Sequence, residues 1–98
     1  MLKFSNKITS EIVDVGMNFQ ALLSATGTIS NAVWGVAVLS GADATPSSLL
    51  EGTTAISGAT AYVRLHGGLA GVTYRIRGEV DASSGEHFVA DAQILVTA

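Results

Sequence analysis

Residues 59–81 read ATAYVRLHGGLAGVTYRIRGEVD and decide the fold. Apolar and polar residues alternate through residues 59–66 and again through residues 72–81, which is the period of a strand with one buried face. Gly67, Gly68 and Gly71 lie between the two runs, and glycine adopts positive φ without steric cost. The stretch therefore predicts two strands joined by a turn. The expected inward row of the second strand is Val72, Tyr74, Ile76, Gly78 and Val80.

The rest of the chain also has strand character. Residues 32–39 are apolar on both faces, which predicts a central or covered strand. Residues 88–96 alternate again after an expected hairpin loop at residues 81–85. Residues 11–23 fit a strand or a helical turn, and we assign a strand followed by a bend. Residues 40–57 are rich in Gly, Ser, Thr and Ala and predict a long loop that contains a short strand.

These strands predict an all-β fold, an antiparallel β-sandwich of the immunoglobulin or fibronectin type III kind. Trp34 is the expected filler of the space between the sheets. A chain of 98 residues supports one core and not two, so we expect a single domain over residues 11–98. Residues 1–10 lack a helical period, which predicts an extended N-terminal arm or a frayed terminus.

The composition indicates a protein that works in an assembly. Charged residues make up 13% of the chain, against a typical value of about 25%. The mean hydropathy is +0.44. Because a small domain has a large surface for its volume, this predicts a subunit that binds copies of itself or other proteins. A net charge of -3 argues against nucleic acid as a partner, since that binding depends on neutralising phosphates.

The N-terminal residues do not have the pattern of a signal peptide, because Lys3, Asn6 and Lys7 interrupt any apolar run. No stretch approaches the roughly 18 apolar residues that span a bilayer. We therefore expect a protein that is made in a cytoplasm and has no membrane partner.

No catalytic or metal-binding constellation is visible. The chain has no Cys, and its two candidate bases, His66 and His87, lie outside any catalytic motif. Two His without Cys fall short of the usual zinc ligand set. The glycine turn lacks the lysine and the helix of a phosphate loop. Asp81 and Glu86 fit hairpin chemistry better than a calcium loop. We predict no catalytic residue, no metal site and no cofactor.

The expected protein interface combines charge with outward apolar side chains. Arg64, Arg75 and Arg77 are predicted to line one outer sheet face. Each pairs either with an acid across the strands, such as Glu79 or Asp81, or with a neighbouring subunit. Apolar side chains on the outer face of the last strand suggest contact with a neighbour. The full candidate set is Phe4, Arg64, Arg75, Arg77, Val89 and Leu95.

A pattern of residues runs along the chain: Glu11, Asp14, Phe19, Leu22 or Leu23, Thr28, Ile29, Trp34, Leu65, Gly67, Gly68, Gly71, Thr73, Tyr74, Ser84 and Gly85. With this pattern the sequence resembles small virion structural proteins of tailed bacteriophages, the phage fiber-tail adaptor or Ig-like virion proteins. The likeness covers nearly the whole chain, and its most specific part is the glycine turn followed by a tyrosine. The resemblance implies a non-enzymatic virion component, and it implies that the Tyr74 hydroxyl bonds back across the corner.

Two placements in the particle remain open, an adaptor at the neck or tail and a decoration protein on the capsid. In both, apolar strand faces and free sheet edges bind capsid, portal, neck or tail proteins, and residues 1–10 are a candidate to add a strand to another subunit. The alternative is a module that binds carbohydrate or a host surface, and its aromatic platform would rest mainly on Tyr62. A small hydrolase has the least support.

Overall fold

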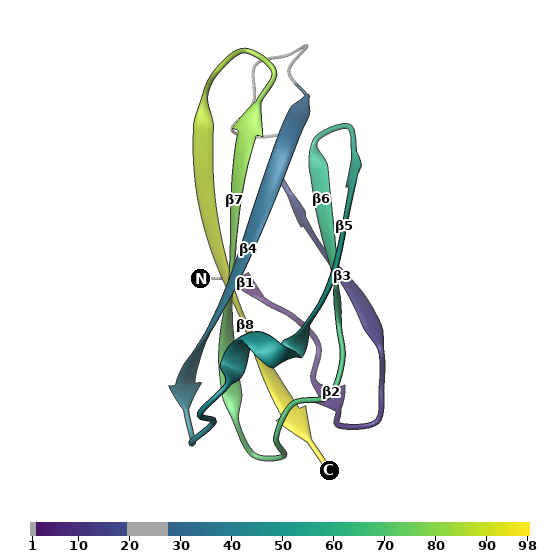
Figure 1. Cartoon of the computed structure of the whole chain (residues 1–98), viewed down its shortest axis with the longest axis vertical. Coiled ribbons are helices and arrows are strands. Elements are labelled where there is room, and N and C mark those ends of the chain that lie inside the picture. Colours follow the sequence, from purple (N-terminus) through teal and green to yellow (C-terminus); the bar gives the residue numbers. More distant parts are fainter. Residues whose placement is uncertain (1, 20–27) are drawn as a thin grey trace.

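The chain forms two stacked β-sheets (Figure 1). The computed structural model describes residues 2–19 and 28–98. In the first sheet, β7 (Thr73–Ala82) lies between β4 (Ile29–Ser40) and β8 (His87–Thr97), and both pairings are antiparallel. In the second sheet, β6 (Thr60–Leu65) lies between β3 (Val13–Asn18) and β5 (Leu50–Ser57), again antiparallel. The all-β sandwich predicted from the sequence is confirmed.

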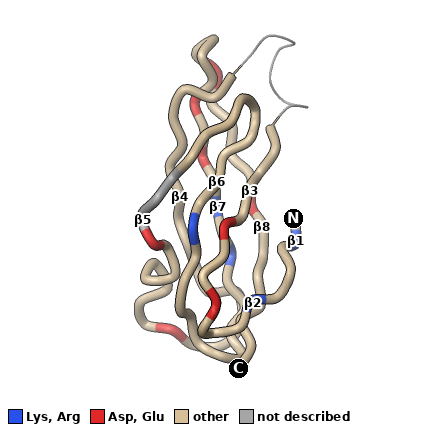
Figure 2. Tube along the Cα trace, turned by 90° about the vertical axis from the view of Figure 1, so that its right-hand side faces the viewer, with Lys and Arg blue, Asp and Glu red and all other residues tan. Residues whose placement is uncertain are grey.

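Two short N-terminal strands complete the first sheet. β1 (Leu2–Lys3) and β2 (Lys7–Ile8) both pair with β8 in parallel, with Leu2 opposite Ala92 and Lys7 opposite Val96. Both strands lie along the edge of β8 in their own chain (Figure 2). A covered edge is protected from pairing with other chains.

Lys7 anchors this segment from inside the protein. Only 1% of the residue is exposed, and its Nζ donates to the carbonyl oxygens of Gly67 at 2.7 Å and Ile8 at 2.9 Å. Burial lowers the pKa of the Lys7 ammonium, and the nearby Glu11 carboxylate partly opposes that shift. The buried charge is held by carbonyl dipoles, and it ties the N-terminal segment to the glycine turn.

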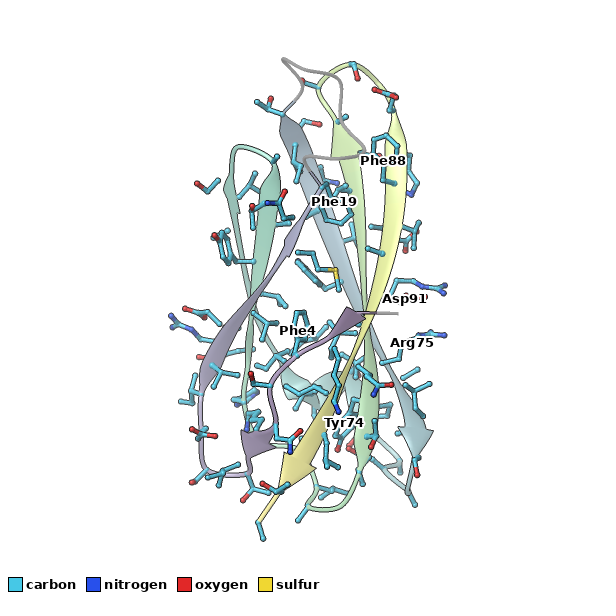
Figure 3. The ribbon with its side chains drawn as sticks, turned by 180° about the vertical axis from the view of Figure 1, so that it is seen from behind. Phe4, Phe19, Tyr74, Arg75, Phe88 and Asp91 are labelled. Carbon is cyan, nitrogen blue, oxygen red and sulfur yellow. The ribbon has the colours of Figure 1, made fainter. Side chains whose placement is uncertain are left out.

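The core lies between the two sheets, where the inward rows meet. The alternation read from residues 59–66 and 72–81 holds, with Ala61, Val63 and Leu65 buried on β6. Phe4 and Phe19 also point between the sheets (Figure 3). The buried residues of β7, β8 and the turn before β7 are Val72, Tyr74, Ile76, Val80, Ala82, Ala92, Ile94 and Val96.

Trp34 lies on the inward face of β4, opposite Gly78 of β7. A Cβ atom at Gly78 would lie 3.0 Å from Trp34 Cζ3 and 3.0 Å from Met17 Sδ. The indole therefore uses the space that the glycine leaves free. This explains why a glycine interrupts an otherwise apolar inward row, a position where it weakens the strand intrinsically.

The corner before β7 is fixed by Tyr74, whose side chain is fully buried. Its hydroxyl accepts a hydrogen bond from the Leu69 backbone N–H at 2.9 Å and donates to Asp43 Oδ2 at 2.7 Å. The φ values of Gly67, Gly68 and Gly71 are 64°, 92° and 84°, which is why glycines are needed in this turn.

Two sequence expectations are wrong. Residues 32–39 belong to β4, which is the edge strand of its sheet and not a central one. Residues 40–57 contain the 3-10 helix η1 (Pro46–Leu49) and the eight-residue strand β5, so less of the stretch is loop than expected. β5 forms by pairing with β6, although the stretch is rich in Gly, Ser and Ala. The bend expected near residues 20–23 lies outside the described residues.

Candidate interaction surface

The surface that best fits contact with another protein is the outer face of the β4–β7–β8 sheet. We use the name outer face for the outward side chains of these three strands. They form cross-strand rows, because the register places Val33, Glu79 and Val89 opposite one another. Other members are Ala37, Arg75, Arg77, Asp81, His87, Asp91, Gln93 and Leu95.

An ion pair occupies the centre of the outer face. Arg77 and Asp91 are opposite in register, and the guanidinium binds the carboxylate through two bonds, Nε to Oδ1 at 2.8 Å and the second nitrogen to Oδ2 at 3.0 Å. The hydrogen bond from Arg77 holds the pKa of Asp91 below its ordinary value. This geometry fixes both side chains and orders the middle of the surface.

A histidine between two acids lies nearer the β7–β8 hairpin. His87 Nδ1 is 2.7 Å from Asp81 Oδ1, and its Nε2 is 3.4 Å from Glu79 Oε1. The hydrogen bond to Asp81, followed by that to Glu79, raises the pKa of His87, and the same contact lowers the pKa of Asp81. All three side chains are exposed, so the cluster presents a charge that depends on pH.

Apolar side chains stand between these charges. Val33 is 56% exposed and Val89 is 46% exposed, and both lie in one row beside Glu79. β4 also has a free edge, since in the described part of the chain it pairs only with β7. Its sequence ISNAVWGVAVLS contains no charged residue. A long, uncharged edge beside exposed valines is a surface that can accept another chain.

The candidate residues do not all meet on this surface. Arg75, Arg77, Val89 and Leu95 are on the outer face, and Figure 3 shows Arg75 and Asp91 pointing away from the second sheet. Phe4 is half-buried and packs against the core, so it lies apart from them.

The prediction that three arginines line one face is wrong. Arg64 belongs to β6 in the second sheet, where it binds Asp14 of β3 at 2.8 Å. β6 and β7 are consecutive in the sequence but belong to different sheets, because the chain crosses from one sheet to the other at the glycine turn. Arg64 pairs with Asp14 and Arg77 pairs with Asp91. Both acids lie outside residues 59–81, so the alternation within that stretch could not identify them.

The second sheet has a separate shallow hollow of about 360 Å³ lined by Asp14, Ala55, Tyr62, Val63 and Arg64. Tyr62 is 39% exposed and lies across Gly16, where a Cβ atom would approach the ring to 2.7 Å. The other five aromatic residues are buried or half-buried. One ring alone is a small platform for a sugar, so the geometry favours the outer face of the first sheet.

The two candidate bases, His66 and His87, lie at strands of different sheets. No group of three His, Asp or Glu side chains among residues 2–19 and 28–98 is placed to hold a metal ion. His66 is exposed at the end of β6, whereas His87 on the other sheet is hydrogen-bonded to Asp81 and Glu79. Within the same residues, none of the helices has the length and apolar character that crossing a membrane requires.

The fold and this surface define a class of protein, a small β-sandwich domain that offers ordered charge and exposed apolar side chains to other proteins. A family model described as podophage GP4 fiber-tail adaptor protein gp77 matches residues 7–97. The chain belongs to this family and is a structural protein of the bacteriophage virion, which confirms the resemblance seen in the sequence. No curated protein sequence matches it.

Proposed function

We propose that this protein is a non-enzymatic adaptor of the phage tail that joins fiber and tail proteins through protein–protein contacts. The observation that carries the proposal is the family match, which spans 91 of the 98 residues at positions 7–97. The family description supports a tail position over decoration of the capsid. The partners are other virion proteins, and copies of the same chain are included among them.

The outer face and the free edge of β4 are the proposed contact sites. The molecule extends 42 × 20 × 20 Å, so one long face covers roughly 800 Å², about one side of a standard protein interface. Val33 and Val89 supply apolar area, and the Arg77–Asp91 pair supplies fixed polar geometry. Such a mixture of apolar and ordered polar groups is typical of interfaces between separately folded proteins.

We also propose that the sandwich is of the immunoglobulin kind. The orders β3-β6-β5 and β8-β7-β4 correspond to the B-E-D and G-F-C strands of such domains, with Trp34 on strand C. The Tyr74 hydroxyl bonds to the backbone five residues upstream, at the E–F corner. These features support the assignment because strand order, corner and tryptophan agree.

The test is incorporation into particles. A phage with this gene disrupted is complemented with the wild-type chain, with Val89→Asp, or with Ile12→Asp. Ile12 is 63% exposed before β3 and lies off the outer face, so it is the matched control. We expect Val89→Asp to remove the protein and the fibers from purified particles, because a charge is buried without a partner. Equal incorporation of both variants would refute the outer face as the contact site.

A further inference from the structure

The five lysines and arginines of the chain are all described, and three of them have fixed partners inside the protein. Arg77 binds Asp91, Arg64 binds Asp14, and Lys7 donates to backbone carbonyls. The side chains of Lys3 and Arg75 have no hydrogen bond or ion pair in the described part of the chain, and Arg75 Nε is buried without a partner. The two cations without a fixed partner are therefore Lys3 and Arg75.

These two residues lie in a single cross-strand row. Arg75 of β7 is opposite Gln93 of β8, and Gln93 is opposite Lys3 of β1. Residues directly opposite in a sheet point to the same face, so both cations are on the outer face. β1 therefore extends that face beyond β8. Neighbouring strands are about 4.8 Å apart, which places the two backbones roughly 10 Å apart.

The row itself is positive, since Lys3 and Arg75 are its charged members, although the chain as a whole carries -3. Arg75 helps to lower the pKa of Asp91, but both oxygens of Asp91 are already bound by Arg77. Arg75 therefore has an electrostatic interaction with Asp91 but no ion pair of its own. Ala37 completes the row on β4 and adds no charge.

We infer that the row of Lys3, Gln93 and Arg75 is the point where an acidic segment of a partner protein docks, with one carboxylate at each cation. This rests on the proposed function, because it specifies the partner of the same outer face. Because Arg75 Nε is buried, the half-buried guanidinium meets a partner's carboxylate through its two terminal nitrogens, which can form two parallel bonds with it. Two cations are too few for a phosphate backbone, whose binding depends on several neutralised charges.

The experiment measures binding of purified protein to particles assembled without it, over a series of NaCl concentrations. Variants Lys3→Gln and Arg75→Gln each remove one charge of the row, and Arg64→Gln removes one charge from the other sheet as the matched control. We expect each row variant to bind about tenfold more weakly at low salt, with the difference shrinking as salt screens the pair. A hexaglutamate peptide should compete with the particles, whereas hexaglutamine should not.

The outcomes separate this inference from the proposed function. If Lys3→Gln and Arg75→Gln bind like wild type while Val89→Asp does not bind, the outer face is a contact site and the carboxylate docking point is refuted. If Val89→Asp also binds normally, the proposed function of the face fails as well. Competition by duplex DNA but not by hexaglutamate would replace the carboxylate by phosphate. If Arg75→Gln does not fold, Lys3→Gln and Lys3→Glu, at an exposed position, decide the question.

Discussion

Replacing Tyr74 by Phe tests the corner that joins the two sheets. The Tyr74 side chain is fully buried, and its hydroxyl links the Leu69 N–H at 2.9 Å with the Asp43 carboxylate at 2.7 Å. Phenylalanine keeps the ring and removes both bonds. The substitution therefore isolates the hydroxyl from the packing of the aromatic side chain.

The expected loss follows from these two bonds. A hydrogen bond to a charged group contributes about 1.5–3 kcal/mol, and a neutral one, such as that from the exposed residue Leu69, about 0.5–1.5 kcal/mol. Asp43 is only half-buried, so water can replace the Tyr74 hydroxyl as its hydrogen-bond donor. This limits the stability that is lost when the Tyr74–Asp43 bond is removed. We expect Tyr74→Phe to lower the free energy of unfolding by about 2–3 kcal/mol. For a domain of this size the melting temperature should fall by roughly 10–20 °C.

Urea denaturation and differential scanning calorimetry measure the effect, with Tyr62→Phe as the control. Tyr62 is exposed on the second sheet, so loss of its hydroxyl should change stability by less than about 0.5 kcal/mol. A loss of stability in Tyr74→Phe no larger than that in Tyr62→Phe would refute the reasoning. The two hydrogen bonds of the Tyr74 hydroxyl would then contribute no more to stability than the hydrogen bonds that this hydroxyl makes with water in the unfolded chain.

Three further predictions follow from the fold. Gly78→Val should cost about 1–3 kcal/mol in urea denaturation because its Cβ meets Trp34 and Met17 at 3.0 Å, whereas a cost below that of a surface substitution would show that the indole moves freely. Deleting residues 1–8 should lower the melting temperature and increase aggregation in light scattering, because β8 loses its covering strands and the buried Lys7; an unchanged melting temperature would contradict this. His87 has a raised pKa when folded, so its ion pairs stabilise the protein below the ordinary value of 6.5, and this stability is lost as pH rises through the folded pKa. Urea midpoints across this range should fall in wild type relative to His87→Gln, and parallel curves would exclude the effect.

Much of the fold was predictable from alternation within single strands. The runs at residues 59–66 and 72–81 identified β6 and β7 with the correct buried rows, because a strand of period 2 records which face is inward. The strand β5 was underestimated, since its small residues have weak strand propensity and it forms by pairing with β6. The edge position of β4 was missed because both of its faces are apolar.

The candidate surface was only partly predictable. Alternation showed that Arg75, Arg77 and Val89 point outward, but it could not show which strands are neighbours. Arg64 therefore lies on the second sheet, apart from Arg75 and Arg77 on the first sheet. The position of Lys3 beside Gln93 depends on parallel pairing between the two ends of the chain, for which a local pattern gives no signal.

By itself the sequence determined the all-β class, the glycine turn, the inward rows and the scarcity of charge. These follow from local sterics and from the periodic burial of neighbouring residues. Only the tertiary structure decided which strands share a sheet, which acids Arg64 and Arg77 bind, and that Lys3 and Arg75 lie in one row without an ion pair to any described residue. Such pairings join residues far apart in the chain, and they depend on register and on the layer to which each strand belongs.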